Sequence, residues 1–190
     1  MSFYNDSESV DKYIEMCADY DGSNIYEMMQ KHLDDGKSIL ELGSGPGFDI
    51  QSLAEHYQVT GSDLSEEFLI RLKIKFPDID FLQLDVKSLN VAKKYDCIYS
   101  NKVLHHLTEV ELSVSLGAQA NSLTQDGLIA HSFWMGEENQ EMEGLLFTYY
   151  REERLLDIIS ENYTIISTMS YQEFEESDSM FVIAQKKVQP

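Results

Sequence analysis

The chain has 190 residues, 43% of them hydrophobic and 11% aromatic, which fits one domain over residues 1–190 with a core of its own. Its 34 acidic and 14 basic residues give a formal net charge of −20, which argues against nucleic acid or an anionic membrane as partner, because both are held by a basic face. No apolar stretch is long enough for a membrane span, and the first residues lack the features of a signal peptide, so we expect a cytoplasmic protein.

Two amphipathic helices are predicted ahead of the first strand. Residues 7–18 place Val10, Ile14 and Cys17 on one stripe, and residues 24–33 do the same with Ile25 and Leu33. Aromatic residues on such helices usually pack in a core. The two cysteines of the chain lie far apart in the sequence and predict neither a disulfide framework nor a zinc site.

A glycine-rich turn follows the first predicted strand. Residues 38–42 form a short apolar run, typical of a strand buried on both faces, and Gly43, Gly45 and Gly47 come directly after it. Helical spacing begins at Phe48, so the turn opens a helix whose free N–H groups face the end of the strand. Glycine at these positions allows a positive φ and a close approach of a ligand to the backbone.

The spacing of the glycines separates three possible ligands. A dinucleotide fingerprint needs its third glycine at position 48, which is Phe48, and a P-loop needs a Gly-Lys-Ser/Thr ending, which does not follow. The segment 41–47, Glu-Leu-Gly-Ser-Gly-Pro-Gly, instead resembles the E/D-x-G-x-G-x-G motif of class I S-adenosylmethionine-dependent methyltransferases. The resemblance implies that Glu41, Gly43, Ser44, Gly45 and Gly47 surround the methionine part of that cofactor.

Acidic residues end the next two predicted strands. The run 58–62 ends at Asp63, before a capped helix over 65–75, and the run 81–84 ends at Asp85. A carboxylate after the second strand can accept hydrogen bonds from both ribose hydroxyls. The resemblance implies that Asp63 and Leu64 hold the ribose and that Asp85 and Val86 hold the adenine.

The fourth predicted strand, 95–100, leads into Asn101 and a histidine pair. Residues 104–107 read Leu-His-His-Leu, a pattern shared with many methyltransferases of small metabolites. The resemblance implies that Asn101 lies beneath the methionine arm and that His105 and His106 border the site of methyl transfer. Either imidazole can act as a base for a hydroxyl acceptor, whereas a carboxylate acceptor needs none. The alternative is that one histidine packs in the core and the other caps the next helix.

The remaining elements complete an alternating pattern. We predict a helix over 108–123, a turn at 126–127, a strand over 128–134, a helix over 152–162 and two strands, 163–171 and 180–185. This order predicts an α/β fold with ligands at the carboxyl ends of parallel strands. The resemblance implies the class I methyltransferase fold, a Rossmann-like three-layer sandwich whose seven-stranded, mostly parallel sheet ends in an antiparallel hairpin. It also implies an N-terminal helical lid over 1–36, to which Tyr4, Tyr13 and Tyr20 would contribute, and a cofactor-binding core over 37–190.

Residues 135–150 fit no clean strand and leave the sheet at its ligand-binding edge, so we expect them to form a substrate-selecting wall. Just before them, His131 fits a satisfied core histidine, and Trp134 is placed to touch substrate. The acids of this region are expected to be solvated rather than to bind metal, and we predict no metal site. These acids are Glu137, Glu138, Glu141 and Glu143.

The sequence therefore predicts an S-adenosylmethionine-dependent methyltransferase that acts on an O, N or C atom of a small molecule by in-line displacement. The motifs of adenine-amino, cytosine-C5 and protein-arginine methyltransferases are missing after the fourth strand. The competing hypothesis is a non-catalytic cofactor-binding regulator or a subunit that needs a partner, and a weaker one is an NAD-dependent oxidoreductase. The sequence gives no oligomeric state.

Overall fold

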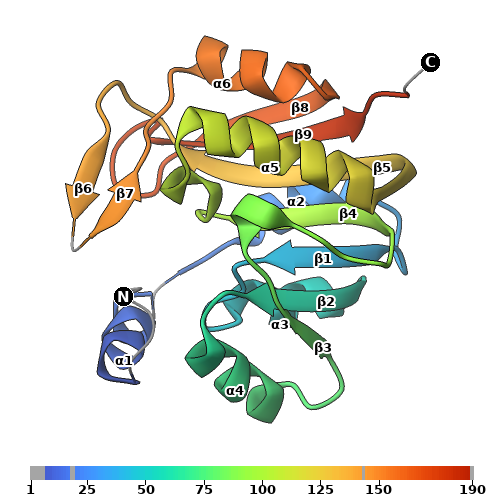
Figure 1. The fold of residues 1–190 in the computed structure, drawn as a ribbon, viewed down its shortest axis with the longest axis vertical. Coiled ribbons are helices and arrows are strands. Elements are labelled where there is room, and N and C mark those ends of the chain that lie inside the picture. Colours follow the sequence, from blue (N-terminus) through green and yellow to red (C-terminus); the bar gives the residue numbers. More distant parts are fainter. Residues whose placement is uncertain (1–6, 18–19, 143, 189–190) are drawn as a thin grey trace.

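The computed structural model describes residues 7–17, 20–142 and 144–188, and its centre is one seven-stranded sheet (Figure 1). The strands lie in the order β3-β2-β1-β4-β5-β9-β8, and only β9 runs antiparallel to its neighbours. This is the mostly parallel sheet with a closing hairpin that the class I methyltransferase fold predicts. The strands are β1 (Ser38–Leu42), β2 (Gln58–Asp63), β3 (Asp80–Gln83), β4 (Tyr95–Asn101), β5 (Leu123–Trp134), β8 (Tyr163–Tyr171) and β9 (Ser179–Lys186).

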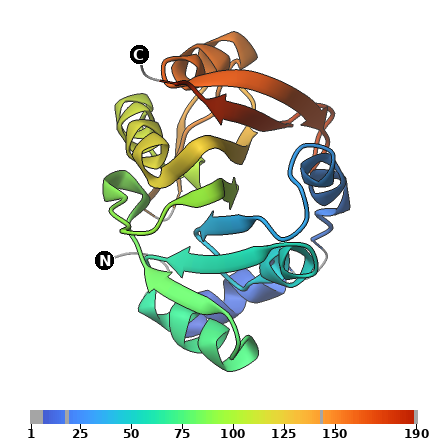
Figure 2. The same ribbon diagram turned by 90° about the vertical axis from the view of Figure 1, so that its right-hand side faces the viewer.

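Helices cover both faces of the sheet, as Figure 2 shows for α5 on one side and α2 and α3 on the other. Buried side chains of alternate strand positions separate to the two faces: Leu40 packs with α5 and α6, and Ile39 packs with α2 and α3. The helices are α1 (Ser7–Met16), α2 (Ser23–Gln30), α3 (Phe48–Ala54), α4 (Glu66–Lys75), α5 (Glu109–Ser122) and α6 (Glu152–Ser160), with short 3₁₀ turns η2 (Val86–Ser88) and η3 (Leu104–His106).

The helix starts follow the capping residues of the sequence. The Ser65 hydroxyl accepts a hydrogen bond from the Phe68 amide at the start of α4. At the start of α5, Thr108 and Glu111 form a reciprocal capping box. Both predicted starts are therefore confirmed.

Two predictions for the second half of the chain are wrong. The turn expected at 126–127 lies inside β5, which begins at Leu123, and the pairing with β4 shifts between Tyr95↔Leu123 and Cys97↔Leu128. The extra residues form an irregularity of the strand rather than a turn into it. Residues 135–150, for which no strand is predicted, contain the hairpin of β6 (Gln140–Met142) and β7 (Leu145–Phe147), which is too short and too exposed to carry an alternating pattern.

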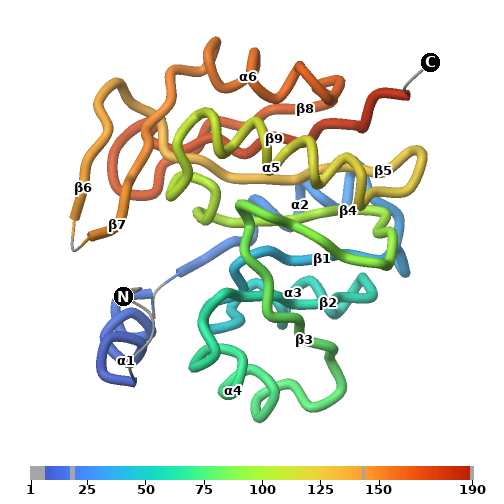
Figure 3. Tube along the Cα trace, viewed as in Figure 1, coloured from blue at the N-terminus to red at the C-terminus, as the bar shows by residue number. Residues whose placement is uncertain are grey.

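The sheet edge at the left of Figures 1 and 3 gathers the connections that bear on function. The trace in Figure 3 shows the β6–β7 hairpin and the turn between β8 and β9 at this edge, with α1 below them. The loops after β1, β2 and β4 leave the parallel strands at their carboxyl ends, on the same side. Among the described helices, none has the length and the apolar character needed to cross a membrane.

Candidate active site

The loop after β1 has the conformation that its glycines predict. Gly43, Gly45 and Gly47 have φ values of +66°, +48° and +75°. A Cβ on Gly43 would lie 2.6 Å from the Val103 side chain, so this position also needs glycine for packing against the segment after β4. Within the described residues, a Cβ on Gly45 would meet the Tyr13 ring alone within 4 Å, at 3.8 Å, so these residues leave the backbone of Gly45 uncrowded.

Asp63 is bound to this loop, as expected for a residue of the same site. Its Oδ2 accepts a hydrogen bond of 2.9 Å from the Gly45 amide, and its Oδ1 accepts one of 2.8 Å from the Ser65 amide. The loop is further fixed by the Ser44 amide, which donates to the Ser62 carbonyl at 2.7 Å. Each Asp63 oxygen keeps a second lone pair, so the carboxylate can still accept hydrogen bonds from a ligand. Leu64 is 55% exposed beside it.

Asp85 lies at the same sheet edge, one strand beyond Asp63. It caps η2, where its Oδ1 accepts a hydrogen bond of 2.8 Å from the Lys87 amide. Its neighbour Val86 is partly buried against the large core cluster. The strand register, with Asp63 beside Gln83, places Asp85 two residues beyond that pair. The adenine-binding role of Asp85 stays a prediction.

A cluster of carboxyl groups lies beneath the glycine loop. Glu41 is 2% exposed, and its Oε2 has no hydrogen-bond partner among the described residues. Burial, followed by the charges of Asp49 and Asp63, raises the pKa of Glu41 well above its usual 4.5. Burial likewise raises the pKa of Asp49 and of Asp63 above 3.8. Such a cluster is complementary to a cation.

Asp49 is the functional candidate that the sequence analysis missed. Its carboxylate accepts hydrogen bonds from Tyr26 at 2.5 Å, from Tyr20 at 2.8 Å and from the Asn101 amide group at 3.2 Å. The only sequence signal is an acid two positions beyond the last glycine, in the first turn of a helix, where acids are common for the helix dipole alone.

Asn101 joins this cluster from the end of β4. Its Nδ2 donates to the Tyr20 hydroxyl at 2.6 Å, and its Oδ1 accepts from Ser132 at 2.5 Å. Tyr20 and Tyr13 of the N-terminal segment therefore lie against the site, and the helical lid over 1–36 stays a prediction. Tyr4 lies outside the described residues.

The histidine pair occupies η3, and its two rings differ in their surroundings. The Nδ1 of His106 lies 2.7 Å from the Leu146 carbonyl, so Nδ1 carries the proton and Nε2 keeps a free lone pair. Burial lowers the pKa of His106 below 6.5, which keeps the ring neutral at neutral pH. His105 is 3% exposed, and neither of its nitrogens has a partner among the described residues. Burial lowers the pKa of His105 well below 6.5.

Residues 135–150 pack against η3, where the expected wall would stand. The Thr148 amide donates to the His105 carbonyl and the Thr148 hydroxyl donates to the Leu107 carbonyl, both at 2.8 Å. Phe147 stacks on His105 with ring centroids 5.3 Å apart. Among the described residues, no group of three or more potential ligands is arranged around a metal position, and Glu143 lies outside them.

Lys102 is a second residue that the sequence did not single out. Its φ of +53° is unusual for a residue with a side chain, and its ammonium lies 3.5 Å from the centre of the Trp134 ring. The ammonium also contacts Ser179 at 2.6 Å and Glu173 at 3.2 Å. Burial lowers the pKa of Lys102 to about 8. Lys102 thus connects the end of β4 to the end of β5 and the start of β9.

His131 is a buried core histidine, as predicted. Its Nε2 lies 2.8 Å from Gln119 Oε1 and its Nδ1 lies 2.9 Å from the Ser100 hydroxyl. Because Gln119 Oε1 can only accept, the proton is on Nε2, and Ser100 donates to Nδ1. Both ring nitrogens are therefore satisfied.

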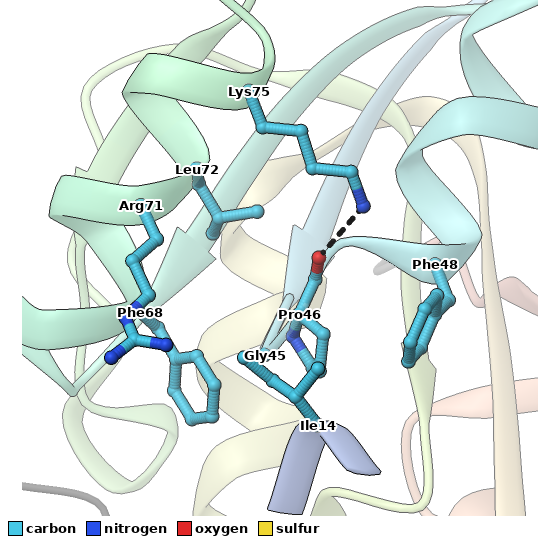
Figure 4. Close-up of a pocket in the computed structure, with 8 residues that line it drawn as sticks. All are labelled: Ile14, Gly45, Pro46, Phe48, Phe68, Arg71, Leu72 and Lys75. Atoms are coloured by element: carbon cyan, nitrogen blue, oxygen red, sulfur yellow. Dashed lines mark hydrogen bonds between the residues drawn. The ribbon is translucent and has the colours of Figure 1, made fainter. Parts of the chain in front are cut away.

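A pocket of about 190 Å³ lies where α1 meets α4 and the glycine loop (Figure 4). Its two cations are already engaged: Lys75 donates to the Pro46 carbonyl at 3.2 Å, and Arg71 contacts Asp11 at 2.6 Å. The Arg71 contact and the edge-on packing of Tyr13 against Phe68 attach α1 to α4. The pocket is thus the gap between α1, α4 and the glycine loop, and its cations have partners within the protein. Its lining is Ile14, Gly45, Pro46, Phe48, Phe68, Arg71, Leu72 and Lys75.

The strand order and the helices on both faces of the sheet are those of the class I methyltransferase fold. Residues 39–127 match the family model described as a methyltransferase domain. A solved structure, the 1,6-didemethyltoxoflavin-N1-methyltransferase of Burkholderia thailandensis with bound 1,6-didemethyltoxoflavin and S-adenosylhomocysteine, superposes with a TM-score of 0.82 at 18% identity, over 95% of this chain and 85% of that one. The chain accordingly has the fold of the class I S-adenosylmethionine-dependent methyltransferases.

Two curated relatives are similar over part of their length. A trans-aconitate 2-methyltransferase of Azoarcus sp. (strain BH72) is 31% identical over 80 residues, which are 40% of this chain and 32% of the relative. A dTDP-3-amino-3,4,6-trideoxy-alpha-D-glucopyranose N,N-dimethyltransferase of Streptomyces venezuelae is 23% identical over 117 residues, 60% of this chain and 49% of the relative. The matches thus span less than half of each relative.

Proposed function

We propose that this chain binds S-adenosylmethionine at the glycine loop and transfers the methyl group to an O, N or C atom of a small molecule. The observation that carries the proposal is the convergence of the loop with Glu41, Asp49 and Asp63, where Asp63 bonds the Gly45 amide at 2.9 Å. The net charge of −20 supports a small acceptor rather than a nucleic acid.

The acid cluster and the loop fit the parts of this cofactor. Glu41 and Asp49, with Asn101 beside them, would face the cationic methionine end, and the Oε2 of Glu41 has no hydrogen-bond partner among the described residues. Asp63 and Leu64 hold the ribose, and Asp85 and Val86 the adenine, at the ends of β2 and β3. The glycine loop, Gly43, Ser44, Gly45 and Gly47, lies beneath the methionine part.

The bound cofactor supplies an activated methyl group, and the chain supplies position and one proton acceptor. In-line displacement depends on the alignment of the acceptor atom, the methyl carbon and the sulfur. The glycine loop and η3 would hold the cofactor and the acceptor from two sides, and Val103, next to η3, packs on Gly43 and so fixes their relative position. His106 is the base for a hydroxyl or ammonium acceptor, since its Nδ1–H is bonded to Leu146 and its Nε2 is free. His105 has no such fixed tautomer.

Calorimetric titration with S-adenosylmethionine tests the binding step. We expect Asp63→Ala to weaken binding by roughly tenfold or more, because hydrogen bonds to a charged group are lost. Asp126→Ala, which changes an exposed acid of β5, is the matched control and should bind as the unmodified protein does. Absence of binding to the unmodified protein at millimolar cofactor would refute the proposal.

Release of S-adenosylhomocysteine across a panel of metabolites tests the transfer step. Binding without release for the whole panel would favour the alternative, a non-catalytic regulator or a subunit that needs a partner. With a hydroxyl acceptor, His106→Ala should lower kcat by about 100-fold or more. In the unmodified protein, the rate should fall only below about pH 6.5, because the pKa of His106 is lowered and the base is lost on protonation.

A further inference from the structure

Five ring side chains from separate parts of the chain meet at the carboxyl edge of the sheet, and we call them the aromatic wall. They are His105 and His106 of η3, Phe147 of β7, Trp134 at the end of β5, and Phe174 between β8 and β9. The edge of His105 faces Trp134 with centroids 6.4 Å apart, and Trp134 stacks on Phe174 at 5.6 Å and an interplanar angle of 16°. Figures 1 and 3 show the hairpin and the turn that carry Phe147 and Phe174 at the same edge.

Phe174 stands out within the wall because it is 76% exposed although it is stacked on Trp134. Its turn is held rigidly, since the Asp178 carboxylate accepts hydrogen bonds from the amides of Glu173, Phe174 and Glu175. The backbone that carries the exposed ring is therefore fixed, and the ring lies against Trp134. Stacking on aromatic side chains is the contact that flat ring systems make best.

The charges at this edge disfavour a polyanionic acceptor. Lys102, the cation that contacts the wall, is already bonded to Glu173, Ser179 and the Phe133 carbonyl. The side chains of Glu41, Asp49 and Asp63, beneath the glycine loop, add no positive charge to this end of the sheet. The wall can thus attract a ring system but has no uncommitted cation for carboxylates among its described contacts.

His105 adds a polar requirement. A neutral imidazole has one N–H donor and one nitrogen acceptor, and in His105 both are buried without a partner among the described residues. A polar group of a ligand directed at one of these nitrogens would give that nitrogen the hydrogen-bond partner that it lacks.

We propose that the acceptor is a flat, uncharged heteroaromatic or phenolic ring system that stacks on the aromatic wall and forms a hydrogen bond with one ring nitrogen of His105. This inference rests on the transferase function proposed above and names the class of its acceptor. His105 is then a specificity-determining residue, while His106 receives the proton.

Trp134 makes the test direct, because it is the single tryptophan of the sequence and its emission reports the wall alone. With saturating S-adenosylhomocysteine, we expect 4-hydroxyquinoline to change the emission saturably and trans-aconitate to leave it unchanged. His105→Phe keeps a ring and removes both nitrogens, and it should weaken 4-hydroxyquinoline binding by about tenfold or more. His56→Phe, in the turn before β2, is the control and should bind the probe as the unmodified protein does.

Parallel calorimetry with S-adenosylhomocysteine separates the two proposals. If S-adenosylhomocysteine binds but 4-hydroxyquinoline produces no saturable change, or trans-aconitate binds instead, the acceptor class is wrong and the transferase proposal stands. If His105→Phe binds the probe as tightly as the unmodified protein, the role of His105 is wrong. If S-adenosylhomocysteine does not bind at all, the transferase proposal and the inference both fail.

Discussion

His131 and His105 are both buried, but their ring nitrogens have different hydrogen-bond partners. In the core between α5 and the sheet, both nitrogens of His131 are hydrogen bonded, to Gln119 and Ser100. At the carboxyl ends of the strands, both nitrogens of His105 are unpaired among the described residues, and the rings of His106 and Phe147 lie beside it. Burial lowers the pKa of both, to about 3 for His131.

This difference in hydrogen bonding separates buried polar groups that stabilise the fold from buried polar groups that are available to a ligand. A buried polar group without a hydrogen-bond partner lowers the free energy of unfolding by about 1–3 kcal/mol. Such groups are therefore uncommon in a folded chain unless they have another role, such as binding a ligand. The closed network of Ser115, Gln119, His131 and Ser100 has no such cost and fixes α5 on the sheet. Glu41, with its unpaired oxygen, resembles His105 in this respect, and both lie at the proposed site.

Breaking the closed network should have the largest effect. His131→Leu leaves Gln119 Oε1 and the Ser100 hydroxyl buried without a partner, and we expect it to lower the free energy of unfolding by about 2–4 kcal/mol. Urea denaturation measures the change, and cofactor affinity measured on the folded variant should be unaltered. A loss below about 1 kcal/mol would show that the network is not closed as described.

The acid cluster extends the comparison to cofactor binding. Burial raises the pKa values of Glu41, Asp49 and Asp63, so these groups hold protons more tightly than ordinary carboxyl groups do, and a bound cation lowers those pKa values. Binding of S-adenosylmethionine should therefore release protons and tighten as pH rises, by up to tenfold per unit for one proton, or about 1.4 kcal/mol. Calorimetry in buffers of different ionisation enthalpy counts the protons. Asp49→Asn should reduce the count, and proton uptake on binding would contradict the sign.

Thr148 tests how the wall is held. Thr148→Val removes the hydroxyl bond to the Leu107 carbonyl and should cost about 1 kcal/mol of unfolding free energy. Because this bond attaches the β6–β7 hairpin to η3, hydrogen exchange at residues 145–150 should accelerate more than elsewhere. Ser113→Ala, which removes an exposed bond to Glu161, is the control. Uniform acceleration across the chain would contradict a local role.

The smallest change in stability is expected for a substitution of His105, and it gives the most direct comparison with His131. His105→Leu leaves no partner unpaired, and we expect the free energy of unfolding to change by no more than about 1 kcal/mol in either direction. The same urea experiment as for His131→Leu measures it. A loss as large as that of His131→Leu would mean that His105 is a structural residue.

Much of the site could be predicted from local spacing. The segment 41–47 contains the end of a strand and a turn of positive φ, and a helix starts directly after it. Asp63 and Asp85 lie at or just after the ends of the next two strands. The places of these residues in the site could therefore be predicted from the order of elements along the chain. Asp49 and Lys102 could not be found in this way. The partners of Asp49 are Tyr20, Tyr26 and Asn101, and those of Lys102 include Glu173 and Ser179. These partners are far away in the sequence, and only the fold brings them into contact.

The sequence by itself determined the alternation of strands and helices, the glycine loop and the carboxylates that follow the strands, because these depend on periodicity and on residues adjacent in the chain. Only the tertiary structure decided which of two neighbouring histidines has a fixed tautomer, which buried histidine is satisfied, and that Phe147, Trp134 and Phe174 meet. Hydrogen-bond satisfaction and ring stacking depend on atoms brought together from distant elements, and no local pattern records them.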